Sequence, residues 1–283
     1  MTDESVYTDY FKSVKSCSKA AQRDFAKVWN LLDLNDVETS KMYLLELLPG
    51  LVEKYGDGAA EAAARMYEAV LLAEKGETVT AELSKVNRDK VVRTVYQVVR
   101  FMEQGEYQRA FSTMNTVVDH QVKQTARRTV ETNAKRDGVR YARVPTGRET
   151  CGFCIMLASR GFVYHSEHTA GGLNHDYHPH CDCMPVPSTQ ADVTVPGYDQ
   201  SYYKGIYDDA RKKVVDTAEW KSYGQQHAYE EQSKMLANQI RLDVYPKQKD
   251  HINEVKRQWW AANKDEQNAK RRAKAAAKRN STK

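Results

Sequence analysis

The sequence reads TCGFC at residues 150–154 and YHPHCDC at residues 177–183. The first stretch contains a CxxC pair, and the second contains a CxC pair that follows after a long segment rich in Gly, His, Ser and Thr. Four of the five cysteines and five of the eight histidines fall within this segment. Clustering of this kind indicates a site rather than scattered packing residues.

The two cysteine pairs meet the requirements of a structural zinc site. Zn²⁺ prefers four nitrogen or sulfur ligands in a tetrahedron at about 2.0–2.3 Å. A CxxC turn presents two thiolates on one side of a tight loop, and two cysteines one residue apart on a strand point to the same face. The predicted ligands are Cys151, Cys154, Cys181 and Cys183, with His178 either replacing one sulfur or hydrogen-bonding to one.

Other interpretations of the same residues stay open. The cysteines could form a reduced cluster packed as a small core, or a disulfide that forms only after release to an oxidising environment. A thiol beside a histidine is also the minimum for a cysteine nucleophile, and Ser159 or Ser166 beside a histidine could form a serine site. However, no G-x-S-x-G elbow is present, and a cysteine bound to a metal cannot attack a substrate. We therefore expect a structural centre rather than a catalytic one.

The chain before this segment is predicted to be helical. Apolar residues recur every three to four positions through residues 7–32, 41–75, 80–102 and 107–135. Interruptions are expected in the second of these helices, at Pro49-Gly50 and again near Gly56. In the last, the valines are predicted to face inward, and five cations are predicted to form a solvated face: Lys123, Arg127, Arg128, Lys135 and Arg136. After the turn signal Asp-Gly at 137–138, the alternating stretch 139–145 indicates a strand.

Helical spacing returns after the cysteine segment. It runs through residues 202–218 and 229–245, where Pro246 is expected to end a helix, and then through 249–263. The predicted fold is mainly α, with a small irregular α+β central module of short strands that holds the CxxC…HPxCxC clip. The predicted units are a helical N-terminal arm (1–137), the cysteine- and histidine-rich module (138–197), a helical C-terminal region (198–263) and a basic, disordered tail (264–283).

The basic character of the chain resides in this tail. The net charge is +5, but residues 264–283 carry eight Lys/Arg and two Asp/Glu, so the rest of the chain has a net charge of about −1. The tail could touch DNA without reading sequence, because clustered cations release phosphate counterions, or it could remain solvated with no ligand. Its candidate contact residues are Lys270, Arg271, Arg272, Lys274, Lys278 and Arg279.

Membrane and secreted classes are excluded at this level. No apolar run approaches the roughly 20 residues that span a bilayer. The N-terminus is acidic where a secretory signal would be basic, so synthesis and residence in a cytoplasm are expected.

The amino-acid sequence of the cysteine segment resembles that of the MuF-like minor head proteins of tailed bacteriophages, especially the branch from phages of actinobacteria. The resemblance rests on TCGFCIMLASRG (150–161), on Val163-Tyr164-x-Ser166 and on YHPHCDC (177–183). In that family a TCxxC element precedes an HPxCxC element inside a long, largely helical chain. The resemblance covers roughly residues 140–190, and the residues that carry over are Cys151, Cys154, His178, Cys181 and Cys183.

The resemblance implies a low-copy minor capsid protein with a structural role in head morphogenesis. Its implied partners are the portal protein and the scaffold or major capsid protein, and its implied location is the virion, after assembly in the host cytoplasm. Many relatives carry the label of capsid maturation protease, so processing of scaffold and capsid proteins is the alternative function. A free DNA-binding regulator is a third class, and it would need affinity that does not depend on the tail.

Overall fold

The structure is a computed structural model, and it describes residues 2–147, 149–166, 169–170, 177–179, 181–190, 193–223, 231–250, 254 and 257. The helices before the cysteine segment are α1 (Glu4–Asn30), α2 (Val37–Lys75), α3 (Arg88–Glu103) and α4 (Tyr107–Arg136). After it come α6 (Gln200–Val214), α7 (Ala218–Ser222) and a further helix over residues 231–250. Between them lie β1 (Arg140–Pro145), α5 (Gly152–Ala158) and β2 (Cys183–Ser188).

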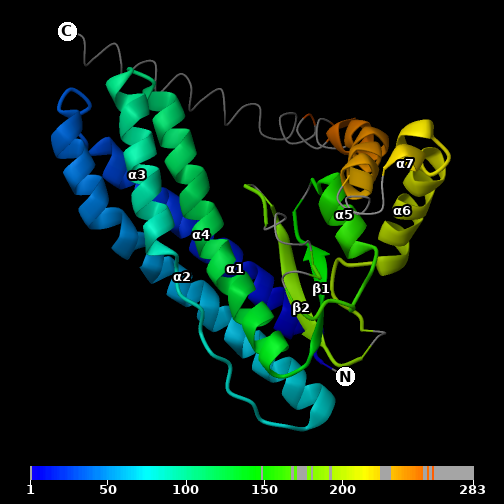
Figure 1. The fold of residues 1–283 in the computed structure, drawn as a ribbon. Helices are drawn as coiled ribbons and strands as arrows, with labels where there is room; N and C mark the ends of the chain where they lie inside the picture. Colours follow the sequence, from blue (N-terminus) through cyan, green and yellow to red (C-terminus); the bar gives the residue numbers. More distant parts are fainter. Residues whose placement is uncertain are drawn as a thin grey trace.

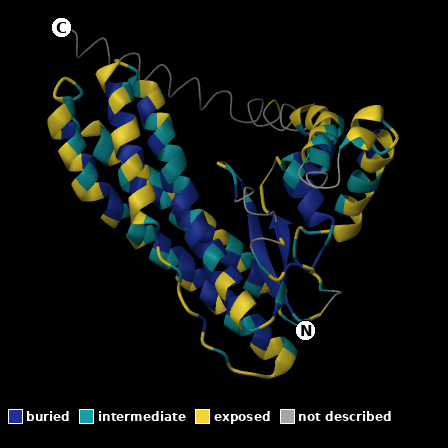
Figure 2. Ribbon diagram, viewed as in Figure 1, coloured by how far each residue is buried: buried dark blue, intermediate teal, exposed yellow. Residues whose placement is uncertain are grey.

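The four long helices form a bundle along one arm of the molecule, and the strands with α5, α6 and α7 form the other (Figure 1). In the bundle α1, α2 and α4 contact one another, and α3 packs on α2 and α4. Figure 2 shows buried residues along the inner faces of these helices and exposed residues along the outer faces. The predicted class is therefore confirmed: the fold is mainly α with a small two-stranded sheet.

The helices begin where side chains can cap them. Asp3, Asp36 and Asn87 each accept a hydrogen bond from a backbone N–H in the first turn of α1, α2 and α3. A capping side chain of this kind satisfies one of the N–H groups that the first turn leaves unpaired. Gly76 ends α2 with φ 71°, a conformation that glycine adopts without steric cost.

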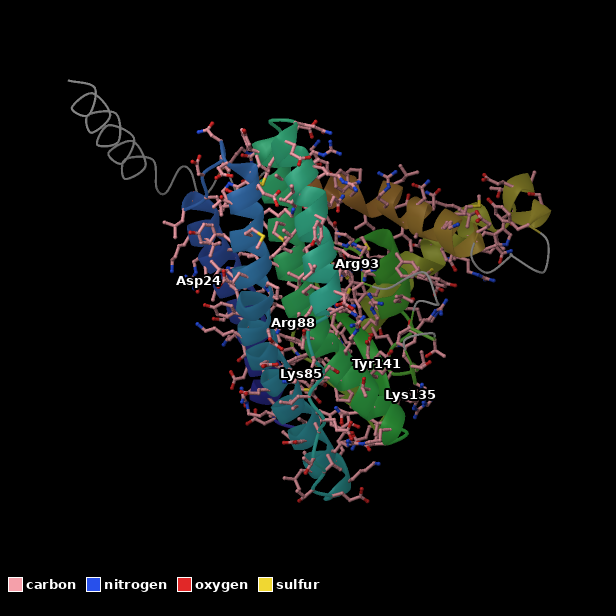
Figure 3. The ribbon with its side chains drawn as sticks, turned by 60° about the vertical axis from the view of Figure 1, so that its left-hand side comes forward. Asp24, Lys85, Arg88, Arg93, Lys135 and Tyr141 are labelled. Carbon is pink, nitrogen blue, oxygen red and sulfur yellow. The ribbon has the colours of Figure 1, made fainter. Side chains whose placement is uncertain are left out.

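The expected interruptions of α2 are absent, because the helix continues through Pro49 and Gly56. The helix packs against α1 and α4 along its length, and it stays continuous although Pro49 cannot donate to the preceding turn. Gly56 serves a close approach instead of a break, since a Cβ there would collide with Val86. Two ion pairs join α2 to the chain around the start of α3: Lys85 in the loop pairs with Asp57 at 3.0 Å, and Arg88, the first residue of α3, pairs with Glu53 at 2.6 Å (Figure 3 labels both cations).

Two further expectations were wrong. The helix over 231–250 includes Pro246, which was expected to end it. Arg127 does not face solvent, because it is fully buried, and the exposed fraction of the Lys123 side chain is only 16%. The expected helix over 249–263 falls almost wholly outside the described residues.

The sheet joins the bundle to the cysteine segment. Strands β1 and β2 are antiparallel, with Pro145 opposite Cys183 and Arg140 opposite Ser188. Nearly every residue of both strands is buried, because α5 covers β1 while α2 and α4 pack on β2. No described helix is long and apolar enough to cross a membrane.

Candidate metal centre

The backbone brings the two cysteine pairs together from the start of α5, the turn at residues 178–181 and the start of β2. Cys151 is the N-cap of α5, where its sulfur accepts a hydrogen bond from the backbone N–H of Cys154 at 3.3 Å. Cys183 begins β2 opposite Pro145, and Cys181 lies just before it, in a turn closed by a hydrogen bond to the His178 carbonyl at 3.0 Å. The antiparallel pairing of β1 and β2 therefore carries the CxC pair to the CxxC turn.

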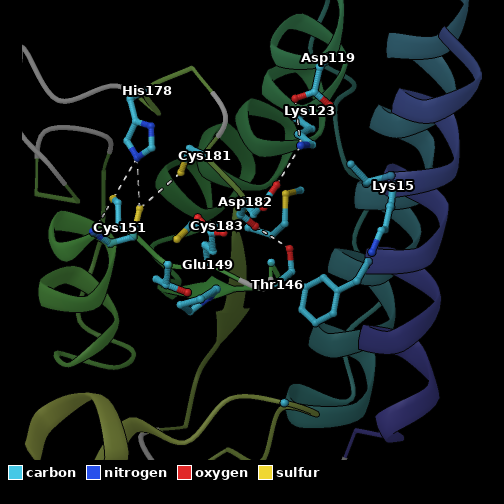
Figure 4. Close-up of a pocket in the computed structure, with 18 of the residues that line it drawn as sticks. Lys15, Asp119, Lys123, Thr146, Glu149, Cys151, His178, Cys181, Asp182 and Cys183 are labelled. Atoms are coloured by element: carbon cyan, nitrogen blue, oxygen red, sulfur yellow. Dashed lines mark hydrogen bonds and ion pairs between the residues drawn. The ribbon is translucent and has the colours of Figure 1, made fainter. Parts of the chain in front are cut away.

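All five predicted ligands gather here, and Figure 4 labels four of them: Cys151, His178, Cys181 and Cys183. Cys151, Cys154 and His178 form one group, and Cys154, Cys181 and Cys183 form a second; within each group the ligand atoms lie within 4.8 Å of one another. Cys154 belongs to both, with its sulfur 3.4 Å from that of Cys181 and 3.9 Å from His178 Nε2. We name these five residues the cysteine–histidine cluster.

His178 is oriented for contact with sulfur. Its Nδ1 donates to the Pro179 carbonyl at 2.7 Å, which leaves Nε2 directed at the Cys151 sulfur, 3.0 Å away. A histidine whose second ring nitrogen is held by a carbonyl is the usual arrangement of a metal-binding imidazole.

Within the cluster, hydrogen bonding separates the thiols into two kinds. Hydrogen bonds from Cys154 and His178 lower the pKa of Cys151 to about 5, and the bond to Cys151 raises the pKa of His178 to about 9. Hydrogen bonds from Cys154 and Cys183, with the charges of Arg127 and Arg143, lower the pKa of Cys181. The pKa of Cys154 is raised because it donates to these neighbours. Hydrogen bonding and the two arginine charges thus make Cys151 and Cys181 more acidic than an ordinary thiol, whereas Cys154 is less acidic.

Two buried arginines frame the cluster. Arg143 lies on β1, and its Nη2 is 3.8 Å from the Cys181 sulfur and 4.0 Å from the Cys154 sulfur, while its Nη1 donates to the Ala170 carbonyl. Arg127 on α4 donates to the carbonyls of Cys181 (2.5 Å) and Cys183 (2.9 Å). An unpaired buried charge is strongly unfavourable, so the cluster needs negative charge of its own beside Arg143.

Both guanidinium groups lie over the ring of Tyr177. The centre of the ring is 4.1 Å from Arg127 and 3.7 Å from Arg143. The Tyr177 hydroxyl donates to Glu131, and its carbonyl accepts from His120 Nε2 at 2.7 Å. Burial lowers the pKa of His120, so this histidine is a neutral donor. Tyr177 thus fixes the start of the HPxCxC element to α4.

The sequence analysis did not predict that Arg127, Arg143 and Tyr177 pack beside the cluster. Arg127 was assigned to a solvated helix face, and Arg143 and Tyr177 were given no role. One signal was available: Arg143 lies between Ala142 and Val144 in the predicted strand, where a buried charged side chain must have a partner.

Other candidates lie elsewhere. His165 is on an exposed turn and belongs to neither ligand group. The Ser159 hydroxyl is buried and donates to the Met156 carbonyl, which turns it away from the histidines. His168, His175 and His180 fall outside the described residues, as do all six candidate residues of the basic tail: Lys270, Arg271, Arg272, Lys274, Lys278 and Arg279.

The donor set fits a metal ion. Four thiols and one imidazole are soft N/S ligands of the kind that zinc prefers, and a tetrahedron with Zn–S bonds of about 2.3 Å has edges of about 3.8 Å. The observed separations of 3.4 and 3.9 Å around Cys154 are close to that edge. The two groups share the Cys154 sulfur, but their ligand atoms do not all lie within 4.8 Å of one another. A single ion with four ligands would therefore require the other ligand atoms to move closer together around this sulfur.

The cluster opens on a cleft of about 1020 Å³ between the two arms. One wall is α1, a second is α4 near Lys123, and the helix over 231–250 contributes Arg241 and Tyr245. At its floor Lys123 pairs with Asp119 and Asp182, both at 3.0 Å. The ligand atoms are therefore reached from the cleft, while Arg143 closes the opposite, buried side.

Comparison with known protein families gives one match, to the family described as VG15 protein, over residues 1–210. This chain belongs to the VG15 protein family. The matched region of this chain holds α1 through α5, both strands and the whole cysteine–histidine cluster. VG15 membership indicates a viral protein of the bacteriophage type and specifies no activity. No curated protein and no solved structure matches the chain.

Proposed function

We propose that this VG15 protein is a MuF-like minor capsid protein of a tailed phage, in which the cysteine–histidine cluster is a structural zinc clip. The observation that carries the proposal is the gathering of Cys151, Cys154, His178, Cys181 and Cys183 in two ligand groups that share Cys154, beside Arg143. The order of these residues along the chain is that of the MuF-like head proteins, and the VG15 match is consistent with a phage origin.

A metal cross-link would stabilise the segment between β1 and β2. Between β1 and β2 the chain makes a long excursion. Its first part packs into the main core through α5, whereas Tyr177, Cys154, Cys181 and Cys183 form a small group of their own. A zinc ion held by both cysteine pairs would close the loop and contribute folding free energy directly. The bundle would then be free to contact the portal protein and the scaffold or major capsid protein.

Metal analysis tests the zinc clip. Protein purified under reducing conditions should contain one zinc per chain, and Cys154→Ser should lose it because Cys154 belongs to both ligand groups. Cys17→Ser is the matched control, since Cys17 lies on α1 away from the cluster. A wild-type content below about half an equivalent would remove the zinc clip from the proposal.

The head role has a separate test. Phage particles assembled without the portal protein should lack this chain, whereas wild-type heads should contain it in low copy. Its presence at equal amounts in portal-free particles would contradict a portal association and leave the zinc result unaffected.

A capsid maturation protease is the second candidate, and one observation favours it. The Cys151 sulfur lies 3.0 Å from His178 Nε2 at the cleft, and the pKa of this thiol is lowered to about 5. A metal-free cluster would thus hold a thiolate beside an imidazolium, the pair that cysteine nucleophiles use. A serine version is disfavoured because Ser159 faces the Met156 carbonyl.

Scaffold cleavage in assembling heads separates the two candidates. Cys151→Ser and His178→Gln should each stop processing if the pair is catalytic, while Ser159→Ala should not. If processing continues in all three variants, the protease assignment is lost.

A further inference from the structure

We propose that the cleft between the two arms binds single-stranded nucleic acid through cations on α1 and an exposed aromatic on the helix over 231–250. This site is separate from the basic tail, and it does not depend on the head role or on zinc. Its elements are Lys12, Lys15 and Lys19 on one wall, with Arg241 and Tyr245 contributed by the other arm.

The α1 wall carries uncompensated positive charge. Residues 10–23 contain four cations and no acidic residue. Lys12, Lys15 and Lys19 are exposed, share one helix face and line the cleft, into which Lys15 extends in Figure 4. None of the three forms an ion pair with any described residue, whereas Lys123 at the floor is neutralised by Asp119 and Asp182.

The opposite arm supplies a cation and a stacking surface. Arg241 and Tyr245 lie one helical turn apart, both are exposed, and both line the cleft. The Arg241 guanidinium donates to Asn238 and forms no ion pair with a described residue, and the exposed fraction of Tyr245 is 48%. This helix is seated against the CxxC turn, because Gly152 leaves no room for a Cβ beside the Ala237 carbonyl.

The dimensions favour a single strand. Lys12 and Lys19 are separated by about 10 Å of helix rise, and a stacked strand carries one phosphate per roughly 3.4 Å, so the row spans about three phosphates. Cations with an exposed aromatic are the usual combination for single-strand binding, because an unpaired base offers its face for stacking. A duplex offers no such face, and a cleft of about 1020 Å³ holds only a short stretch of chain.

The test is fluorescence anisotropy of the full-length, reduced protein with a labelled dodecathymidylate, repeated over a range of salt concentrations. The logarithm of the affinity falls linearly with the logarithm of the salt concentration, with a slope of roughly 0.7 per phosphate contact on a single strand. Replacing Lys12, Lys15 and Lys19 with Gln removes three such contacts and should therefore lower the magnitude of this slope by about 2. Between 50 and 200 mM salt, this variant should lose about sixteen-fold less affinity than the wild type. Tyr245→Leu should weaken binding about tenfold or more with an unchanged slope.

A matched control uses α3, where Lys90, Arg93 and Arg100 are equally exposed, form no ion pair with a described residue and do not line the cleft (Arg93 is labelled in Figure 3). Their replacement by Gln changes the net charge by the same amount and should leave the slope within about 0.5 of the wild type. A tail variant should still bind the oligonucleotide, and adding Tyr245→Leu to it should weaken binding by the same factor as in the wild type. In this variant six tail cations are replaced by Gln: Lys270, Arg271, Arg272, Lys274, Lys278 and Arg279.

Four results would overturn the proposal. The first two are equal salt slopes for the cleft and α3 variants, and loss of all binding in the tail variant. The other two are an affinity for the thymidylate–adenylate duplex equal to that for the single strand, and displacement of the labelled oligonucleotide by polyglutamate as effective as displacement by unlabelled oligonucleotide of the same charge. The last would assign the cleft to an acidic protein segment. Thermal unfolding followed by circular dichroism shows that each variant is folded.

Discussion

The guanidinium of Arg143 lies 3.7 Å from the centre of the Tyr177 ring, and the guanidinium of Arg127 lies 4.1 Å from the same centre. One aromatic ring therefore contacts two buried cations, and the negative charge of its face attracts both of them. A cation–π contact between desolvated groups is worth about 2 kcal/mol or more. Through these contacts Tyr177, which directly precedes the HPxCxC element, joins that element to Arg143 on β1 and to Arg127 on α4.

Tyr177 is accordingly expected to be important for stability. Tyr177→Ala should lower the free energy of unfolding by about 3–5 kcal/mol, because it leaves a cavity beside two cations. Tyr177→Phe keeps the ring and loses only the hydrogen bond to Glu131, so about 1–3 kcal/mol is expected. Urea denaturation followed by circular dichroism measures both. Equal losses in the two variants would show that the ring is not what matters.

Arg143 should influence metal binding without being a ligand. Arg143→Met removes the donor that faces the Cys154 and Cys181 sulfurs, and zinc affinity should fall about 10–100-fold. Arg140→Met, three positions earlier on β1, is the matched control and should retain wild-type affinity, because Arg140 has no contact with the cluster. Competition with a chromophoric chelator gives both constants. Similar affinities in the two variants would exclude Arg143 from supporting the thiolates.

The metal-free protein should lose stability in mild acid. The pKa of His178 is raised from 6.5 to about 9, so its contribution is complete below 6.5 and declines as pH rises through 9. The pKa of Cys151 is lowered from 9.0 to about 5, so its contribution is complete above 9 and is lost as pH falls through 5. Between 6.5 and 9 the two slopes cancel, and from 6.5 down to 5 only the loss from Cys151 remains.

Urea midpoints of reduced, chelator-treated protein between pH 5 and 9 check this expectation. The difference in stability between wild type and Cys151→Ser should be constant above pH 6.5 and should shrink towards pH 5. A difference that stays constant down to pH 5 would contradict the thiolate–imidazolium pair.

Gly152 should control how the helix over 231–250 is seated. Gly152→Ala places a methyl group against the Ala237 carbonyl, so this helix should shift away from the CxxC turn at a cost of about 1–3 kcal/mol. Gly205→Ala on α6 is the control, because its methyl group meets nothing within 4 Å, and it should stabilise by about 0.5–1 kcal/mol. Hydrogen exchange of residues 231–250 reports the shift. Unchanged protection in Gly152→Ala would show that this contact is dispensable.

The parts of the fold that depend on local pattern could be predicted from the sequence. The long helices follow from apolar spacing, and β1 follows from the Asp-Gly turn and the alternation after it. The ligand set could be proposed from the CxxC and HPxCxC spacings, although the sequence does not say which sulfur is shared; in the structure Cys154 is common to both groups.

What could not be predicted depends on distant packing. Pro49 and Gly56 carry the local signals of a break, but contacts with α1 and α4 override them. Arg127 has the periodicity of an outward residue, and it is buried because carbonyls more than 50 positions away accept its hydrogen bonds. Composition and spacing do not encode such partners.

The continuity of α2 has a mechanical consequence. At 1.5 Å per residue, its 39 residues form a strut about 58 Å long, roughly twice the diameter of a small domain. A partner bound near Val37 would sit almost the full length of the molecule from a partner bound near Lys75. If partners bind at both ends, the continuous α2 would fix the distance between them, which two helices hinged at Pro49 would not.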